Sequence, residues 1–180
     1  MVKSRATSSG FTLVELLVTM VVFGILASIA IPSFSDLIKN SRLATETNDL
    51  MSDLAYARSE AARQGKRVTL CVSSNGTSCG TGSAWAGGRI VFADTGTYGT
   101  VDGTDTVLRA SSSVSAKKIT ITASGFSTLN YLQFKQSGAT SSGTNGKFMI
   151  CDDRTGAHGR EIELLITGRA ALKTTSASCP

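Results

Sequence analysis

A long uncharged apolar segment near the N-terminus constrains this chain more than any other feature. The 20 residues 16–35 carry no charged side chain, and at about 1.5 Å per residue a helix of this length crosses a hydrocarbon layer of about 30 Å. The acid Glu15 directly precedes the segment. A carboxylate inside a membrane helix costs roughly 2.5–3.5 kcal/mol on insertion scales. We therefore expect a membrane helix whose one acid has a partner or a task.

The residues before this segment are typical of a processing signal. The segment 1–10 is short, basic and rich in Ser and Thr, and it ends at Gly10. An ordinary secretory signal is one alternative, because Ser28-Ile29-Ala30 has the small-x-small pattern of a cleavage site. Glu15 and an apolar run longer than about 7–15 residues argue against it. A plain membrane anchor without a role in assembly is the other alternative.

The order Gly10-Phe11-Thr12-Leu13, with Glu15 and then an apolar run that contains Pro32, resembles the class III signal of type IV prepilins and pseudopilins. The resemblance implies that an inner-membrane prepilin peptidase cleaves after Gly10 and methylates Phe11. It also implies that Glu15 pairs with the N-terminal amine of a neighbouring subunit in a filament. Such burial is tolerable because a cation then meets the carboxylate.

Composition limits what the remainder of the chain can be. A length of 180 residues suits one ordinary domain plus the N-terminal helix. Lys and Arg number 18 against 13 for Asp and Glu, a net charge of +5. Loss of Lys3 and Arg5 with the leader leaves 16 against 13, or +3. This mild excess predicts no dedicated nucleic-acid binder, so any such role requires local clustering.

The helix is expected to continue beyond the apolar segment. Pro32 should kink or locally melt it, since proline removes one backbone donor. Residues 36–64 then predict an amphipathic helix that ends before Gly65. Its apolar stripe consists of Leu43, Thr47, Leu50, Leu54, Ala57 and Ala61. The charged residues expected to lie largely away from that stripe are Lys39, Arg42, Glu46, Asp49, Asp53, Arg58, Glu60 and Arg63.

Beyond Gly65 the pattern predicts strands only. The expected strands are 68–72, 88–93, 107–108, 118–122, 129–135, 147–151 and 160–167. No second helix is available for a parallel crossover, so the sheets should be antiparallel. We predict an α+β chain with three parts: a leader (1–10), a transmembrane and assembly half-helix (11–35), and a globular domain (36–180) in which residues 66–180 are β-rich.

The four cysteines predict two disulfides, because an even number in a chain with an export signal indicates an oxidising compartment. Cys71 and Cys79 flank Asn75-Gly76, which is a strong hairpin signal. Cys151 and Cys179 are then expected to tie the last strands to the C-terminal tail. A metal site is not predicted, since no C-x-x-C occurs and the single histidine, His158, lies seven residues after Cys151.

Three other segments give weaker signals. Trp85 is predicted to be a core residue rather than a ligand platform. Asp94, Asp102 and Asp105 suggest calcium, but their spacing does not fit an EF-hand loop, and a solvated turn is preferred. Residues 137–146 are predicted to be a flexible linker.

Several motifs outside the signal resemble the GspH/FimT group of minor pilins and minor pseudopilins. They are Tyr56-Ala57-Arg58-Ser59-Glu60-Ala61, residues 68–71, Trp85 with residues 90–94, Cys151-Asp152-Asp153-Arg154 and Gly168-Arg169. The resemblance implies the pilin fold, a long helix packed on antiparallel β-sheets. It also implies an inner-membrane protein with a single span and a periplasmic globular domain, which then joins the filament tip. The implied partners are major and minor pilins, the prepilin peptidase and the inner-membrane assembly platform.

Some FimT proteins bind DNA through a C-terminal loop that reads G-R-x-R, which this chain only partly matches. Here Gly168-Arg169 is followed by Ala171 in place of the second arginine, and Lys173 lies two residues later. Lysine neutralises a phosphate without the two-pronged geometry of arginine. The candidate DNA-binding residues are Arg169, Lys173, Arg160 and Arg154. With Lys147 they number five against four acids, so only weak, salt-sensitive contact is expected.

An enzyme is not predicted. The sequence has one histidine, no nucleophile-elbow motif, no phosphate-binding glycine loop and no paired metal ligands. No cofactor is expected either. Three hypotheses remain: a structural minor pilin, a DNA-binding minor pilin that serves natural transformation, and a minor pseudopilin of a type II secretion system.

Overall fold

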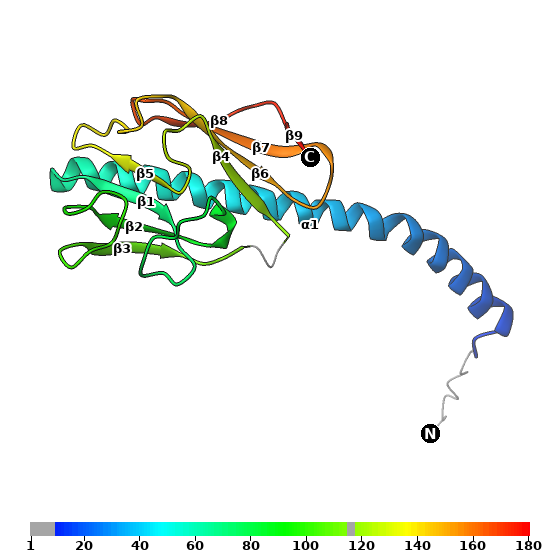
Figure 1. Cartoon of the computed structure of the whole chain (residues 1–180). Helices are drawn as coiled ribbons and strands as arrows, with labels where there is room; N and C mark the ends of the chain where they lie inside the picture. The colour runs from blue at the N-terminus through cyan, green and yellow to red at the C-terminus, as the bar shows by residue number, and fades with distance from the viewer. Residues whose placement is uncertain (1–9, 115–117) are drawn as a thin grey trace, which may run out of the picture. The chain divides into compact units, whose positions relative to one another are not determined.

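The computed structural model describes residues 10–114 and 118–180, and for residues 30–33 the backbone alone. The predicted leader, residues 1–10, lies outside the described residues except for Gly10. The chain divides into two compact units, Met1–Asn40 and Ser41–Pro180. The elements are α1 (Leu13–Gln64), β1 (Val68–Val72), the 3-10 turn η1 (Trp85–Gly87), β2 (Arg89–Ala93), β3 (Thr106–Ser111), β4 (Thr120–Ser124), β5 (Tyr131–Phe134), β6 (Gly146–Cys151), β7 (Gly156–Leu164), β8 (Ala170–Leu172) and β9 (Ala177–Cys179) (Figure 1).

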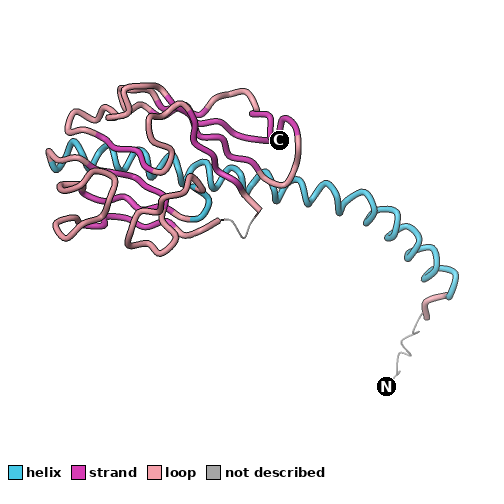
Figure 2. The backbone as a smooth tube through the Cα atoms, viewed as in Figure 1, coloured by secondary structure: helices cyan, strands magenta, loops and turns pink. Residues whose placement is uncertain are grey.

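Two antiparallel sheets make up the β-rich part of the second unit. The first has the strand order β3-β2-β1-β5, and the second has the order β4-β6-β7-β8, with β9 also paired to β7. The ladders between these strands are all antiparallel. The C-terminal half of α1 runs between the two sets of strands (Figure 2). The predicted α+β class and pilin-type arrangement are confirmed.

One face of α1 provides the centre of the core. The predicted stripe from Leu43 to Ala61 is buried, and Thr47 satisfies its hydroxyl by donating to the Leu43 carbonyl at 2.6 Å. Side chains from both sheets complete a single cluster with it. The helix ends at Gln64 because Gly65 adopts φ +62°, a conformation that suits glycine after a helix.

Two acids on this helix do not lie where the sequence predicted. Glu46 and Asp53 are buried, at 2% and 1% exposure. Asp53 is buried because β2 and β3 bring arginines to it. Arg89 Nε lies 2.8 Å from Asp53 Oδ2, and Arg109 Nε lies 3.1 Å from Oδ1. The helical periodicity assigned Asp53 to the polar face, since it contains no information about cations from distant strands.

Trp85 is a core residue, as predicted. Its ring is buried and meets Phe148 edge-on at 5.0 Å between centroids. Its indole N–H donates to the Leu129 carbonyl at 2.8 Å, so burial leaves no polar atom of the ring unpaired. Trp85 therefore joins η1 to the second sheet.

Several boundaries differ from the predictions. β7 begins at Gly156, well before the predicted residue 160, and β8 and β9 were not predicted. Both of these short strands depend on pairing with β7, which their own sequence does not signal. α1 continues through Pro32 as helix, so the expected local melting is not seen.

The segment 137–146 is not a flexible linker. Thr140 is buried, its amide donates to the Ile166 carbonyl at 2.9 Å, and the amide of Ser141 donates to the Gln133 carbonyl at 2.9 Å. Asn75-Gly76 forms a turn but not a tight hairpin. The Asn75 side chain itself accepts the amides of Thr77 and Ser78, each at 3.0 Å, and the next strand starts only at Arg89.

Candidate functional site

The N-terminal half of α1 presents an apolar surface in the first unit. α1 is the one helix in the described part of the chain that is long and apolar enough to cross a membrane. Its large apolar side chains from Leu13 to Ile29 are exposed, and Phe11 is 74% exposed. Because water solvates such a surface poorly, this segment requires lipid or other helices around it.

Glu15 lies in the first turn of this helix. Thr12 is the N-cap, and its hydroxyl oxygen accepts the amide of Glu15 at 3.2 Å. The Glu15 side chain is exposed and makes no ion pair with another described residue. The carboxylate therefore has free acceptor capacity two residues from Leu13, where α1 starts. At this position the positive end of the helix dipole favours the negative charge of Glu15.

The two disulfides of the structure are the two that the sequence predicted. Cys71 bonds Cys79, with 5.7 Å between the Cα atoms, and Cys151 bonds Cys179, with 5.8 Å. The second bridge attaches β9 to the end of β6. A side chain at Gly159 would lie against both of its sulfur atoms, so glycine is required where β7 passes the bridge.

The candidate DNA-binding residues are not brought together. Arg154 and Arg169 lie beyond opposite ends of the nine-residue strand β7, and at about 3.3 Å per residue they are separated by roughly 30 Å. Arg160 pairs across the sheet with buried Ile150, so it lies on the core-facing side of β7. Lys173 directly follows Leu172, the partner of core-facing Ile162, so it lies on the opposite, outward face of the sheet. These residues are close in the sequence but not in space.

Two of the four candidate cations, Lys173 and Arg154, already have an acidic partner, and Lys173 shares Glu161 with Lys147. Lys173 Nζ lies 2.6 Å from Glu161 Oε1, and Lys147 Nζ lies 2.8 Å from Oε2. Arg154 is held by Asp152 at 2.6 Å. Arg169 is exposed and makes no ion pair among residues 10–114 and 118–180.

The glycine of the Gly-Arg motif has a structural task. Gly168 adopts φ +78° in the turn between β7 and β8, and a side chain there would overlap the Gly138 carbonyl oxygen. The Nε of Arg58 lies 3.3 Å from the position that such a side chain would take. Gly168 thus lets two loops and the helix meet, and it presents Arg169 at the surface.

Glu161 provides a pH-dependent contribution to stability. The hydrogen bond from Lys147, followed by that from Lys173, holds the pKa of Glu161 below its usual range. Because a lowered carboxyl pKa stabilises the fold only while the group is ionised, this contribution is present above the unfolded-state pKa of about 4.3. It is lost as the pH falls through the folded-state pKa.

We therefore expect Glu161→Gln to lower the free energy of unfolding by about 1 kcal/mol at pH 7. The difference from wild type should shrink below the unfolded-state pKa of about 4.3 and disappear once the pH is below the lowered folded-state pKa. Urea unfolding at several pH values measures this. Glu163→Gln, two residues along on the same face, is the matched control and should change stability less. An equal difference at pH 7 and at low pH would contradict the assignment.

Comparison with known proteins decides the family. The sequence profile described as Type II transport protein GspH matches residues 46–168, and that of the prokaryotic N-terminal methylation motif matches residues 5–31. The chain belongs to the GspH family. Among curated proteins no sequence matches it.

Solved structures show that this GspH-family chain shares its fold with a minor pilin. A crystal structure of the type IV minor pilin FimU from Pseudomonas aeruginosa is 22% identical with a TM-score of 0.64, covering 80% of this chain and 99% of that chain. A second crystal form of FimU gives 22% identity and a TM-score of 0.60, covering 77% and 100%. The minor pseudopilin EpsH of Vibrio cholerae is 11% identical with a TM-score of 0.46, covering 73% and 95%.

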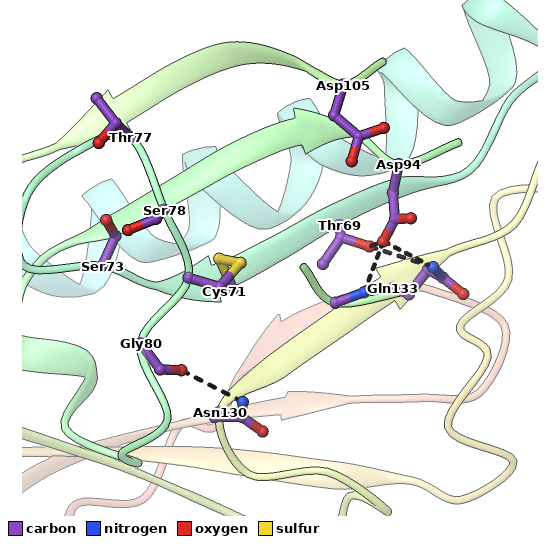
Figure 3. The surroundings of a disulfide bond; sticks show 12 residues. Thr69, Cys71, Ser73, Thr77, Ser78, Gly80, Asp94, Asp105, Asn130 and Gln133 are labelled. Atoms are coloured by element: carbon purple, nitrogen blue, oxygen red, sulfur yellow. Dashed lines mark hydrogen bonds between the residues drawn. A yellow bond between two sulfur atoms is a disulfide. The ribbon is translucent and has the colours of Figure 1, made fainter. Parts of the chain in front are cut away.

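One buried polar cluster of this GspH-family chain was not predicted. Asp94 Oδ2 accepts hydrogen bonds from Thr69 Oγ1 at 2.6 Å, from the Gly99 amide at 2.9 Å and from Gln133 Nε2 at 3.1 Å. Figure 3 shows these bonds converging on Asp94 near the Cys71–Cys79 disulfide. The sequence predicts for Asp94 only a place in a solvated turn or a calcium loop, with no hydrogen-bond partners. Its partners come from three separate segments, so spacing alone could not reveal them.

Each of the three acids of that loop accepts a hydrogen bond from a backbone amide of the same loop. Asp102 accepts the Thr97 amide at 2.8 Å, and this bond is the main reason that the pKa of Asp102 is lowered. Asp105 accepts the Thr95 amide at 2.8 Å. Among the described residues no group of three or more His, Cys, Asp or Glu side chains is arranged to hold a metal. Asp94 is buried, so the predicted solvated turn is wrong for this residue.

Proposed function

We propose that this chain is a minor pilin. A prepilin peptidase cleaves it after Gly10 and methylates Phe11. The inner membrane holds it by α1 with the globular unit in the periplasm. It is then incorporated at or near the tip of a type IV pilus, where it helps to initiate assembly with major and minor pilins on the inner-membrane platform.

The observation that carries this proposal is the exposed Glu15 carboxylate directly before residues 16–35 of α1, which carry no charge. A membrane anchor needs only apolar surface, and an acidic side chain in it makes insertion into the membrane less favourable. An acid is useful where helices pack together and a neighbouring amine neutralises it. The N-terminal methylation motif that matches residues 5–31 supports the same reading, because Phe11 would supply such an amine.

A minor pseudopilin of a type II secretion system is the alternative. It is favoured by the description of the matching family, Type II transport protein GspH. Both functions use the same helix and the same processing, so the residues discussed above serve either one. The fold shared with FimU supports the pilus.

The experiment is to follow an epitope-tagged chain from the membrane to the filament. We expect mass spectrometry to find a mature chain that starts at N-methylated Phe11, and sheared pili to contain it in small amounts. Deleting the gene should reduce surface pili and leave protein secretion unchanged. If the deletion leaves pili normal but abolishes protein secretion, the chain is a minor pseudopilin and not a minor pilin. An uncleaved chain that stays in the membrane would contradict both functions.

DNA binding for natural transformation is the finer part of the proposal, and it now depends on Arg169. Lys173 and Arg154 have acidic partners, and Arg160 lies on the core-facing side. Arg169→Ala should therefore weaken DNA retention and lower its salt dependence, whereas Lys173→Ala should have less effect. Unchanged retention and transformation in Arg169→Ala would end the DNA-uptake hypothesis.

A further inference from the structure

A small hollow lies between the loop after β2 and the loops that flank β5. Its volume is about 220 Å³, and its walls include Arg67, Tyr98, Gln133, Thr128, Ser141 and Ser142. Sites for drug-sized ligands usually measure about 300–1,000 Å³. This hollow therefore has room for a single small ring rather than a larger ligand.

Gln133 presents a fixed acceptor in this hollow. The side chain is 4% exposed, and its Nε2 donates to Asp94 Oδ2 at 3.1 Å and to Thr69 Oγ1 at 3.3 Å. A carboxylate only accepts, so Asp94 forces the amide to turn its nitrogen inward. The oxygen then points away from Thr69 and Asp94 (Figure 3). Asp94 also holds the Gly99 amide, which fixes the loop carrying Tyr98.

Arg67 supplies a positive donor next to this acceptor. Its guanidinium carbon lies 4.1 Å from the centroid of the Tyr98 ring. Stacking occupies the flat face of a guanidinium and leaves its N–H edge free for a carboxylate. Tyr98 is 52% exposed, so this pair is open to solvent. Asp94 keeps its negative charge, since its three donors are neutral groups, but it is buried and does not line the hollow.

The hydroxyl groups of the hollow act as acceptors. Thr128 Oγ1 donates its proton to the Tyr131 carbonyl at 2.8 Å, and Ser141 Oγ donates to the Gln133 carbonyl at 3.3 Å. Their lone pairs are then available for donors on a ligand. The hollow thus combines several acceptors with one cationic donor over an aromatic ring.

We propose that this hollow binds one sugar unit that carries a carboxylate, as found in an acidic polysaccharide. The sugar hydroxyls donate to Gln133 Oε1, Thr128 and Ser141, and the carboxylate accepts from Arg67. A nucleotide fits less well, because Arg67 already covers Tyr98 and the hollow of about 220 Å³ has room for a single small ring rather than for a base with its sugar. This adds surface recognition to the assembly role and does not depend on it.

The test measures glucuronate binding to the full-length chain in detergent micelles by saturation-transfer NMR, with glucose and a deoxynucleotide as competing probes. Arg67→Ala should weaken glucuronate binding about tenfold, the effect of losing a hydrogen bond to a charged group. Lys135→Ala is the matched control. Lys135 is exposed and follows Phe134, the partner of Val68, so it lies beside Arg67 in register but does not line the hollow.

Glucuronate binding that exceeds glucose binding, falls in Arg67→Ala and persists in Lys135→Ala supports the proposal. Equal binding of the two sugars, equal loss in both variants, or no saturation transfer to glucuronate overturns it. Preferential binding of the deoxynucleotide, lost in Arg67→Ala, also overturns it and assigns the hollow to nucleic acid. Thermal unfolding of each variant checks that the fold is retained.

Discussion

Replacing Glu15 with alanine is expected to abolish incorporation of the chain into filaments while leaving membrane insertion and cleavage intact. The carboxylate is exposed and makes no ion pair within the described chain, so its removal breaks no contact there. The cap is also preserved, since Thr12 binds the backbone amide of Glu15 and not its side chain. Alanine favours a helix at least as well as glutamate. Any defect must therefore arise when the helix meets a neighbour.

In a helix bundle, the neighbour's N-terminal amine would lose its counter-charge. Leaving one partner of a buried pair uncompensated costs about 3–5 kcal/mol, or at least about a hundredfold in the assembly equilibrium. Quantitative immunoblots of sheared filaments and membranes measure this ratio. Val14→Ala, one residue earlier in the same exposed turn, is the matched control. Normal incorporation of Glu15→Ala would refute pairing with the amine.

The fold was largely predictable because its main elements have local signals. The stripe from Leu43 to Ala61 is a property of helical periodicity, and alternation in residues 68–72 is a property of a strand. β8 and β9 lacked such signals, since three-residue strands exist only through their pairing with β7. The prediction of a flexible linker at 137–146 was wrong for the same reason, because this segment is ordered by hydrogen bonds to Gln133 and Ile166 outside it.

At the N-terminus the sequence supports a site hypothesis, because the methylation motif that matches residues 5–31 consists of neighbouring residues. The roles proposed for Gly10, Phe11 and Glu15 depend on their order along the chain, whereas the DNA candidates needed proximity in space. Arg154 and Arg169 are close in number but lie at opposite ends of β7. The hollow around Gln133 could not be predicted either, because Asp94 defines it through partners 25 and 39 residues away.

Asp53 illustrates the same limit, and it leads to the largest expected effect on stability. Its carboxylate binds buried Arg89 at 2.8 Å, and it also accepts from Ser111 Oγ at 3.0 Å. Asp53→Ala would leave Arg89, which is 2% exposed, without its buried counter-charge. We expect the free energy of unfolding to fall by about 3–5 kcal/mol. Asp49→Ala, one turn earlier and exposed, should change it by no more than about 0.5 kcal/mol.

Urea unfolding of the full-length chain in detergent micelles measures both variants, and a double variant separates charge from packing. Among the described residues the Nη1 of Arg89 finds no acceptor, so the pair is incompletely satisfied. Replacing both partners by apolar residues, Asp53→Leu with Arg89→Met, should therefore restore much of the stability that Asp53→Ala loses. A loss below about 1 kcal/mol in Asp53→Ala would show that water reaches Arg89. A double variant as unstable as the single one would show that β2 and α1 need the ion pair itself to pack together.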